Sequence, residues 1–361
     1  MSVTEKDVLA ALSKVMDPEL NVDLVRAGMV KDLKVTGNTV RLKIELTTPA
    51  CPLKPKIEAD AQAALKAIPG LEKADIDWGA SVRAAPGGVS TEALLPGVKN
   101  VVLVGAGKGG VGKSTVAVNL AVALARCGAK VGLLDADFYG PSIPTMMGVH
   151  RKPVSRDGKS LEPIEAHGIK VMSIGFLVEP DQALVWRGPM LHGALTQLVR
   201  DVLWGELDYL VLDLPPGTGD VALTISQQLR AAGAVLVTTP QDVALADVVR
   251  AKQMFDKVHI PVLGIVENMS QFACPNCHTV TPIFDHGGGK KAAEMMGLAF
   301  LGELPIELRV RQSGDKGVPI VAAFPDSPEA KAFMTLAQTI AGRISQENLR
   351  VRPPMMAAVP A

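Results

Sequence analysis

The eleven residues Gly105–Thr115, GAGKGGVGKST, constrain the fold of this chain more than any other stretch. They contain the pattern G-x-x-x-x-G-K-S from Gly107 to Ser114, follow the apolar run VVLVGA, and precede STVAVNLAVALARCG, which has the apolar spacing of a helix. In that setting glycines let backbone N–H groups turn toward a phosphate, and the helix N-terminus favours its negative charge. The sequence therefore predicts a strand, a phosphate-binding loop and a helix in succession.

Each polar residue of this loop has an expected task. Lys113 would neutralise the β- and γ-phosphates of a nucleotide, and the Ser114 hydroxyl would hold Mg²⁺. Asp213, in YLVLDLPPGTGD, ends another apolar strand, where an outer ligand of that Mg²⁺ belongs. Asp135 and Asp137, in LLDADFYGPS, follow a third strand, and one of them could orient the attacking water. The loop residues expected to contact the nucleotide are Gly107, Lys108, Gly109, Gly110, Val111, Gly112, Lys113, Ser114 and Thr115.

The pattern of the whole chain predicts two domains. Residues 1–83 alternate helical spacing with a hairpin-like stretch around Gly37-Asn38, which indicates a small α+β domain. Residues 84–99 are rich in glycine and proline, and we expect them to form a linker. From 100 to 347 buried apolar strands alternate with helices, as in a mostly parallel sheet covered on both faces, and residues 348–361 are expected to be a flexible tail.

Composition narrows the class of protein. Lys and Arg together number 37, as do Asp and Glu, so the formal charge of zero gives no sign of a nucleic-acid-binding face. The charged N-terminus lacks a signal-peptide core, and no apolar window reaches the ~18 residues of a membrane helix. We therefore expect a soluble, cytoplasmic protein without membrane or nucleic-acid partners.

A second motif, CPNC, places Cys274 and Cys277 directly after the strand PVLGIVENMS. Two thiolates fill neither a tetrahedral zinc site nor an iron–sulfur site, because both need four ligands. Three completions are open: His278 and His286 could join a zinc site, the pair could cycle as a disulfide, or a second copy of the chain could add two thiolates. A dimer with a Cys₄ site on its two-fold axis suits an iron–sulfur cluster best.

The segment GKGGVGKST resembles the deviant Walker A motif of MinD/ParA-type ATPases, a group of P-loop NTPases. That resemblance implies that Lys108 is the signature lysine, which reaches across a dimer interface to the nucleotide of the partner protomer. It also implies that Asp137 positions the attacking water and that Asn268, in VENMS, contacts the adenine. Lys108, Lys113 and Asp137 are thus the expected catalytic residues.

The order of motifs along nearly the whole chain resembles the Mrp/ApbC-type iron–sulfur cluster carriers. These motifs are GKGGVGKS, DADFYGPS, VWRGPM, DLPPGTGD and ENMSQFACPNC, preceded by a region similar to MIP18-like domains at DPEL and TTPACPLK. The resemblance implies slow ATP hydrolysis coupled to the loading or transfer of a cluster, most simply [4Fe–4S], held by Cys274 and Cys277 of two protomers. It also implies a homodimer, scaffold and apo iron–sulfur proteins as partners, and an assembly role for Cys51. The alternatives are a positioning ATPase of the MinD/ParA type and a zinc-stabilised ATPase scaffold.

Overall fold

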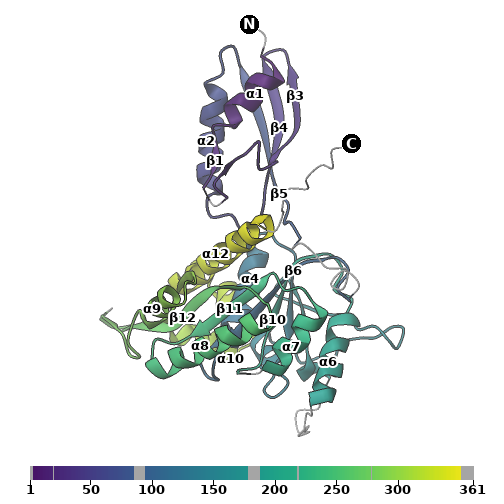
Figure 1. Ribbon diagram of the computed structural model, residues 1–361, viewed down its shortest axis with the longest axis vertical. Coiled ribbons are helices and arrows are strands. Elements are labelled where there is room, and N and C mark those ends of the chain that lie inside the picture. The colour runs from purple at the N-terminus through teal and green to yellow at the C-terminus, as the bar shows by residue number, and fades with distance from the viewer. Residues whose placement is uncertain are drawn as a thin grey trace, which may run out of the picture. The chain divides into compact units, whose positions relative to one another are not determined.

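The computed structural model of the chain describes residues 3–18, 20–84, 94–177, 188–217, 219–277 and 279–350 (Figure 1). By its internal contacts the chain divides into two compact units. One contains the first 83 residues together with the chain from Ala341 onward, and the other runs from Ala84 to Ile340. Each unit is described by itself below.

The small N-terminal unit is an α+β fold built on a three-stranded sheet of order β3-β4-β5. Strands β3 and β4 form the antiparallel hairpin expected around Gly37-Asn38, with Thr36 opposite Thr39. Helix α2 leads from β4 to β5, which pairs with β4 in parallel. A capping box between Thr4 and Asp7 starts α1. The elements are α1 (Glu5–Leu12), β1 (Met16–Asp17), β2 (Val22–Asp23), β3 (Val30–Thr36), β4 (Thr39–Leu46), α2 (Lys54–Lys66) and β5 (Lys73–Ala80).

The larger unit is built on a nine-stranded sheet of order β13-β12-β11-β6-β10-β7-β9-β8, with β14 also paired to β12. All its pairings are parallel except β8 with β9 and β12 with β13. Its strands are β6 (Val98–Ala106), β7 (Val131–Asp135), β8 (Ile164–Ala166), β9 (Ile169–Ser173), β10 (Leu207–Asp213), β11 (Gly233–Thr238), β12 (Val262–Ala273), β13 (Val280–Thr281) and β14 (Phe300–Ile306).

Helices cover both faces of this sheet, which confirms the fold class predicted from the sequence. Figure 1 shows α4 and α12 on one face and α6, α7 and α8 on the other. The central strands are buried along nearly their whole length, as double-sided cover requires. The helices are α4 (Lys113–Arg126), α5 (Ile143–Met146), η1 (Ile174–Phe176), α6 (Gly188–Arg200), α7 (Gly219–Gln228), α8 (Asp242–Lys257), α9 (Gly288–Met295), α10 (Leu308–Asp315), α11 (Ile320–Ala323) and α12 (Pro328–Arg350).

The strand order determines where polar side chains gather. Strand β6 lies between β11 and β10, and β10 lies between β6 and β7. The chain leaves β6 toward β7 but leaves β10 toward β11, so the sheet is wound in opposite directions from its centre. Such a point opens a crevice at the carboxyl ends of the strands. The phosphate loop after β6 and the aspartates after β7 and β10 all lie at that edge.

Two expected segments fall partly outside the described residues. In the expected linker at 84–99, residues 85–93 are not described, while β6 begins at Val98. Helix α12 continues to Arg350, so the first three residues of the expected tail are helical, and 351–361 are not described. In the part of the chain that is described, no helix combines the length and apolar character needed to cross a membrane.

Candidate functional site

The phosphate loop joins β6 to α4 and depends on glycine at defined positions. Gly110 and Gly112 have φ angles of +82° and +83°, in the left-handed region that glycine adopts without strain. At Gly107 a Cβ atom would lie only 2.3 Å from the backbone carbonyl carbon of Asp247 in α8. The loop therefore packs directly against α8, and its glycines serve this packing as well as the approach of a phosphate.

Lys113, the first residue of α4, brings the predicted catalytic groups together. Its Nζ lies 2.6 Å from Asp213 Oδ1, 3.6 Å from Asp137 Oδ2 and 3.1 Å from Ser114 Oγ. The lysine side chain is only 7% exposed, so its charge is balanced by buried carboxylates and not by water. The lysine expected to bind phosphate is thus held by Asp213, which ends β10, and by Asp137, which lies two residues beyond the end of β7.

Asp213 also offers an atom to a metal ion. Its Oδ2 is buried and has no hydrogen-bond partner among the described residues, although buried carboxylate oxygens are normally paired. The Ser114 hydroxyl also lies within hydrogen-bond distance of the Lys113 ammonium, as Asp213 does. Oxygen atoms of Ser114 and Asp213 are therefore close together. Oxygen donors of this kind suit Mg²⁺, which commonly takes one or two protein oxygens together with phosphate oxygens. The residues present therefore fit the predicted Mg²⁺.

The structure separates Asp135 from Asp137, which the sequence left as alternatives. Asp135 is fully buried and accepts hydrogen bonds from Asp137 N at 3.1 Å, Ile143 N at 3.3 Å and Ser173 Oγ at 2.9 Å. Burial, and after it the nearby Asp213 carboxylate, raises the pKa of Asp135 to about 8. Asp135 thus holds the loop after β7, whereas the Asp137 carboxylate faces Lys113.

Lys108 lies on the exposed side of the loop. It is half-buried, and within the described residues its ammonium makes no ion pair or side-chain hydrogen bond. The adjacent Gly109 and Gly110 are exposed. A lysine in this position is available to a group outside its own chain.

Asn268 occupies a place that sequence reasoning did not foresee. Its Nδ2 donates a 2.8 Å hydrogen bond to the carbonyl oxygen of Val111 inside the phosphate loop. The contact is tight, because a Cβ atom at Gly112 would lie 2.2 Å from Asn268 Nδ2. Asn268 and Val111 are 157 positions apart, so no local pattern could reveal the contact. An adenine contact for Asn268 stays a prediction.

Cys274 and Cys277 lie at the turn between β12 and β13. The antiparallel ladder ends with Ala273 opposite Val280, and Cys274 N donates to Thr279 O at 3.0 Å. Both thiols are free; Cys274 is half-buried and Cys277 is exposed. The hydrogen bond between Cys277 Sγ and Thr279 Oγ1, at 3.3 Å, lowers the pKa of the Cys277 thiol. The turn therefore presents a thiol with enhanced thiolate character, the form that binds metals.

His286, one of the two histidines proposed as zinc partners, belongs to a different group of possible ligands in the described structure. His286 Nε2 lies 2.7 Å from Glu303 Oε2, and Glu267 is close enough to share a metal ion with both. Over the described ranges this is the only such group of three or more residues, and it contains neither cysteine. His278 lies outside the described residues. Among the described residues, the possible metal ligands at the CPNC turn are therefore Cys274 and Cys277.

Cys51 belongs to the core of the small unit. Its side chain is 8% exposed and packs with buried residues such as Leu46 and Ile57. The burial explains the cysteine as a small apolar residue just before α2. The predicted role of Cys51 in cluster assembly remains a prediction.

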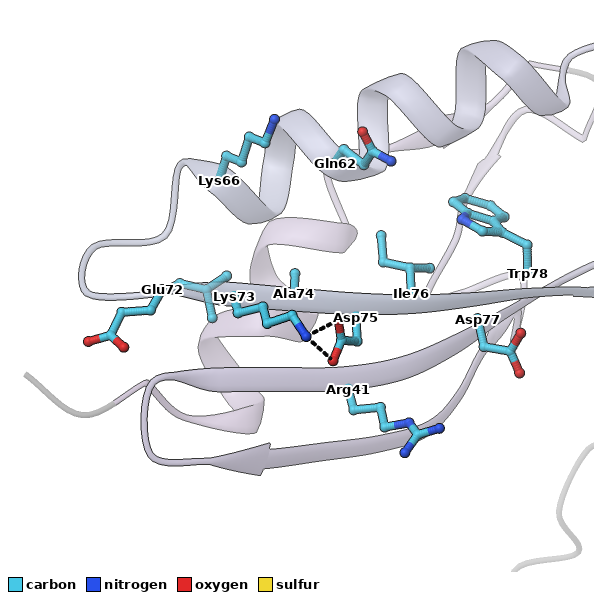
Figure 2. Close-up of a pocket in the computed structure, with 11 residues that line it drawn as sticks. Arg41, Gln62, Lys66, Glu72, Lys73, Ala74, Asp75, Ile76, Asp77 and Trp78 are labelled. Carbon is cyan, nitrogen blue, oxygen red and sulfur yellow. Dashed lines mark hydrogen bonds and ion pairs between the residues drawn. The ribbon is translucent and has the colours of Figure 1, made fainter.

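Two hollows on the described surface bear on the extent of the site. A cavity of about 240 Å³ beside the phosphate loop is lined by residues including Gly107, Leu214 and Phe255. A wider groove of about 610 Å³ follows the open edge of β5 below α2, and Figure 2 shows its Lys73–Asp75 ion pair together with Trp78 at one end. The lining of this second groove includes no cysteine or histidine, so it does not extend the site described above.

Known families match both parts of the chain. The model described as NUBPL iron-transfer P-loop NTPase matches residues 97–341, which include the phosphate loop, the aspartates and the CPNC turn. The chain belongs to this family of iron-transfer P-loop NTPases. A second model, described as iron–sulfur cluster assembly protein, matches residues 5–78 of the small unit. The resemblance recognised in the sequence is confirmed.

Relatives of this NTPase are described as iron–sulfur proteins, and two of them match it over nearly its full length. An iron–sulfur cluster carrier protein of Deinococcus radiodurans is 52% identical over 347 residues, covering 96% of this chain and 97% of the relative. One from Synechocystis sp. is 48% identical and covers 96% of this chain and 99% of the relative. An Arabidopsis thaliana protein described as a mitochondrial iron–sulfur protein required for NADH dehydrogenase is 53% identical over 258 residues, covering 71% and 82% of the two chains.

Solved structures agree on the fold of the NTPase unit. A nucleotide-binding protein of Archaeoglobus fulgidus, in complex with ADP and with cobalt detected, is 43% identical, with a TM-score of 0.55 over 62% of this chain and 88% of that chain. The cell division ATPase MinD of Pyrococcus furiosus is 24% identical, with a TM-score of 0.52 over 67% of this chain and 98% of that chain. The second likeness shows the fold alone.

Proposed function

We propose that this chain is an ATP-hydrolysing carrier that binds an iron–sulfur cluster between two protomers and transfers it to apo-proteins. One observation carries the proposal: Cys274 and Cys277 are two free thiols on a surface turn, and among the described residues neither belongs to a group of three or more possible metal ligands. An iron–sulfur cluster takes four thiolates. Two copies of Cys274 and Cys277 related by a two-fold axis supply them.

The surface next to the cysteines supports burial against a second protomer. Val280 is 55% exposed, Ile283 is 53% exposed and Phe284 is 37% exposed. These side chains follow the CPNC turn within a few residues, and apolar side chains gathered on a surface often mark a protein interface. A dimer that joins the two turns would cover them.

The nucleotide half of the proposal assigns a task to each side chain in the loop. On ATP binding, Lys113 exchanges its carboxylate partners for the phosphates, and Asp137 is freed to orient the attacking water. Ser114 would hold Mg²⁺ directly and Asp213 would be its outer ligand, and the ion would neutralise charge on the phosphate oxygens. Lys108 reaches the nucleotide of the partner protomer, and Asn268 borders the adenine.

The cluster half of the proposal concerns cargo. The cluster is [4Fe–4S], and the dimer receives it from scaffold proteins and passes it to apo iron–sulfur proteins. Hydrolysis is slow because each turnover serves a transfer and not the production of ADP. The small domain contributes Cys51 to assembly, and neither nucleic acid nor membrane takes part.

A zinc-stabilised ATPase is the second candidate. It is favoured by the cobalt recorded with the nucleotide-binding protein of Archaeoglobus fulgidus, because thiolate pairs also bind divalent first-row metals. The family assignment favours cluster transfer over the third possibility, a positioning ATPase.

Anaerobic reconstitution with iron and sulfide tests the proposal on the full chain. We expect a brown dimer that holds about four iron atoms and transfers them to an apo iron–sulfur protein. Cys277→Ser should abolish iron retention, while the matched variant Cys127→Ser, at the half-buried free thiol that caps the C-terminus of α4, should retain it. A colourless protein that takes up zinc through Cys277 and no iron would contradict the carrier function and leave nucleotide binding intact.

A further inference from the structure

Strand β12 links the two halves of the site within a few residues. At Asn268 it touches the phosphate loop through the 2.8 Å hydrogen bond from Nδ2 to Val111 O. Six positions later, directly beyond its end, the chain reaches Cys274. No other described strand touches the phosphate loop and leads directly into the cysteine turn.

Asn268 is closely packed against the phosphate loop. Asn268 is 8% exposed, and the position of a Cβ atom at Gly112 would fall 2.2 Å from its Nδ2. The left-handed φ of Gly112 at the start of α4 brings the loop this close. A shift of the Val111 carbonyl on phosphate binding must therefore move Asn268 or break its hydrogen bond.

A bulge lies between this contact and the cysteines. Asn268 faces Leu304 of β14 while Phe272 faces Ile306, so β12 carries two extra residues over that interval. Met269 has a φ of +58°, an uncommon value for a residue with a side chain, and Ser270 Oγ donates to Leu304 O at 3.1 Å. Bulges near functional sites redirect a strand. We call the bulged segment Met269–Gln271 the joint of β12.

Beyond the bulge the strand and the cysteine turn form one hydrogen-bonded piece. Phe272 pairs with Thr281 and Ala273 with Val280, and the amide of Cys274 then bonds to Thr279 O. Thr279 also holds the Cys277 thiol. A change in direction at the bulge would move both cysteines together.

We propose that β12 transmits the nucleotide state of the phosphate loop to the cysteine turn, with Asn268 as the coupling residue and Met269–Gln271 as the joint. The inference rests on the proposed function and specifies how ATP regulates the cluster site within one chain. Binding of ATP or ADP alters the position of Val111, and the bulge converts this displacement into a change in the positions of Cys274 and Cys277. Each ligand biases the joint by its different affinity for the two arrangements.

The test measures the alkylation rate of Cys277 by N-ethylmaleimide in the full-length, cluster-free protein. Peptide mass spectrometry resolves the reaction at each cysteine, with and without saturating Mg-ADP or a non-hydrolysable ATP analogue. Allosteric couplings are typically about fivefold or more, so we expect a nucleotide-dependent rate change of at least that size in the parent chain. Asn268→Ala should remove it.

Asn119 provides the matched control. Its Nδ2 donates to Thr115 O at 2.9 Å, so it contacts the same loop-to-helix segment from α4 and not from β12. Asn119→Ala should keep the nucleotide effect on Cys277. Repeating the measurement at several protein concentrations separates an effect within one chain, which is independent of concentration, from burial of the turn in a dimer.

Because Asn268 touches the loop, its variant can also weaken nucleotide binding, which calorimetry would reveal. Ser270→Ala removes the hydrogen bond to Leu304 O, which does not involve the loop, and should reduce the nucleotide effect at full nucleotide occupancy. Met269→Gly should do the same, and because the Met269 side chain lies near Gly112, its nucleotide affinity is checked by calorimetry as for Asn268→Ala. The inference is overturned if all three β12 variants keep the parental rate ratio, or if bound nucleotide leaves the parental rate unchanged. A parent chain that shows the effect but takes up no cluster would contradict only the proposed carrier function.

Discussion

The phosphate loop and the cysteine turn lie on the same sheet yet differ in how completely one chain builds them. At the loop, Lys113 is buried between two aspartates, and each partner is fixed by its own strand or helix. At the turn, a two-residue strand, β13, supports two accessible thiols. The contrast agrees with the proposed function, in which one protomer binds nucleotide and two protomers build the cluster site.

Lys113→Ala should give the largest effect. ATP hydrolysis should fall to background, because no other described side chain places a cation where the Lys113 ammonium lies. Asp213 would remain buried without its cation, so we expect a loss of about 3 kcal/mol in the free energy of unfolding, measured in urea. Lys99→Ala is the control: its ion pair with Asp208 is more exposed, and its loss should cost less than about 1 kcal/mol. Equal losses of stability in the two variants would contradict the interpretation that Lys113 is a buried cation held by Asp137 and Asp213.

Cys274→Ala and Cys277→Ala should separate the two regions. Iron retention should disappear in either variant, while ATP binding stays at the parental level. Because the turn is exposed, the free energy of unfolding should change by no more than about 0.5 kcal/mol. Calorimetric titration with ATP checks the first expectation for nucleotide binding, and unfolding in urea checks the free energy of unfolding. Loss of nucleotide binding together with iron would instead indicate a turn that stabilises the whole NTPase unit.

Lys108→Ala should affect only what the dimer does. The side chain has no partner among the described residues, so folding and ATP binding should be preserved. Hydrolysis should fall about 10²-fold, the scale for losing one donor to developing transition-state charge. Single-turnover hydrolysis and native mass measurements give the two readouts. Unchanged hydrolysis would assign Lys108 to a solvated loop position.

Asp135→Asn should leave nucleotide binding and iron retention in place and show its effect in the pH dependence of stability. The pKa of Asp135 is raised to about 8, so between roughly pH 4 and pH 8 the folded chain keeps a proton that the unfolded chain releases. Its contribution to the free energy of unfolding is therefore present below the unfolded pKa and is lost as the pH rises toward 8. The variant should flatten this part of the stability curve, measured by thermal unfolding from pH 5 to pH 8. An unchanged slope would show that Asp135 is ionised in the folded protein.

Several elements were predictable because their signals are local. The phosphate loop, the hairpin around Gly37-Asn38 and the buried strands follow from residues that are neighbours in sequence. The CPNC turn was expected as a loop, and the structure adds that β13 closes it into a hairpin. The two-residue length of β13 explains why no alternating pattern revealed it.

The sequence by itself determined the family and the sheet class, and it predicted which residues bind phosphate and which thiols bind a metal. Tertiary structure decided how those residues divide the work: Asp137 faces Lys113 while Asp135 holds a loop, and Asn268 grips Val111. The physical reason is distance along the chain. Lys113 and Asp213 are 100 positions apart, and only the order of strands in the folded sheet brings such groups within a hydrogen bond of one another.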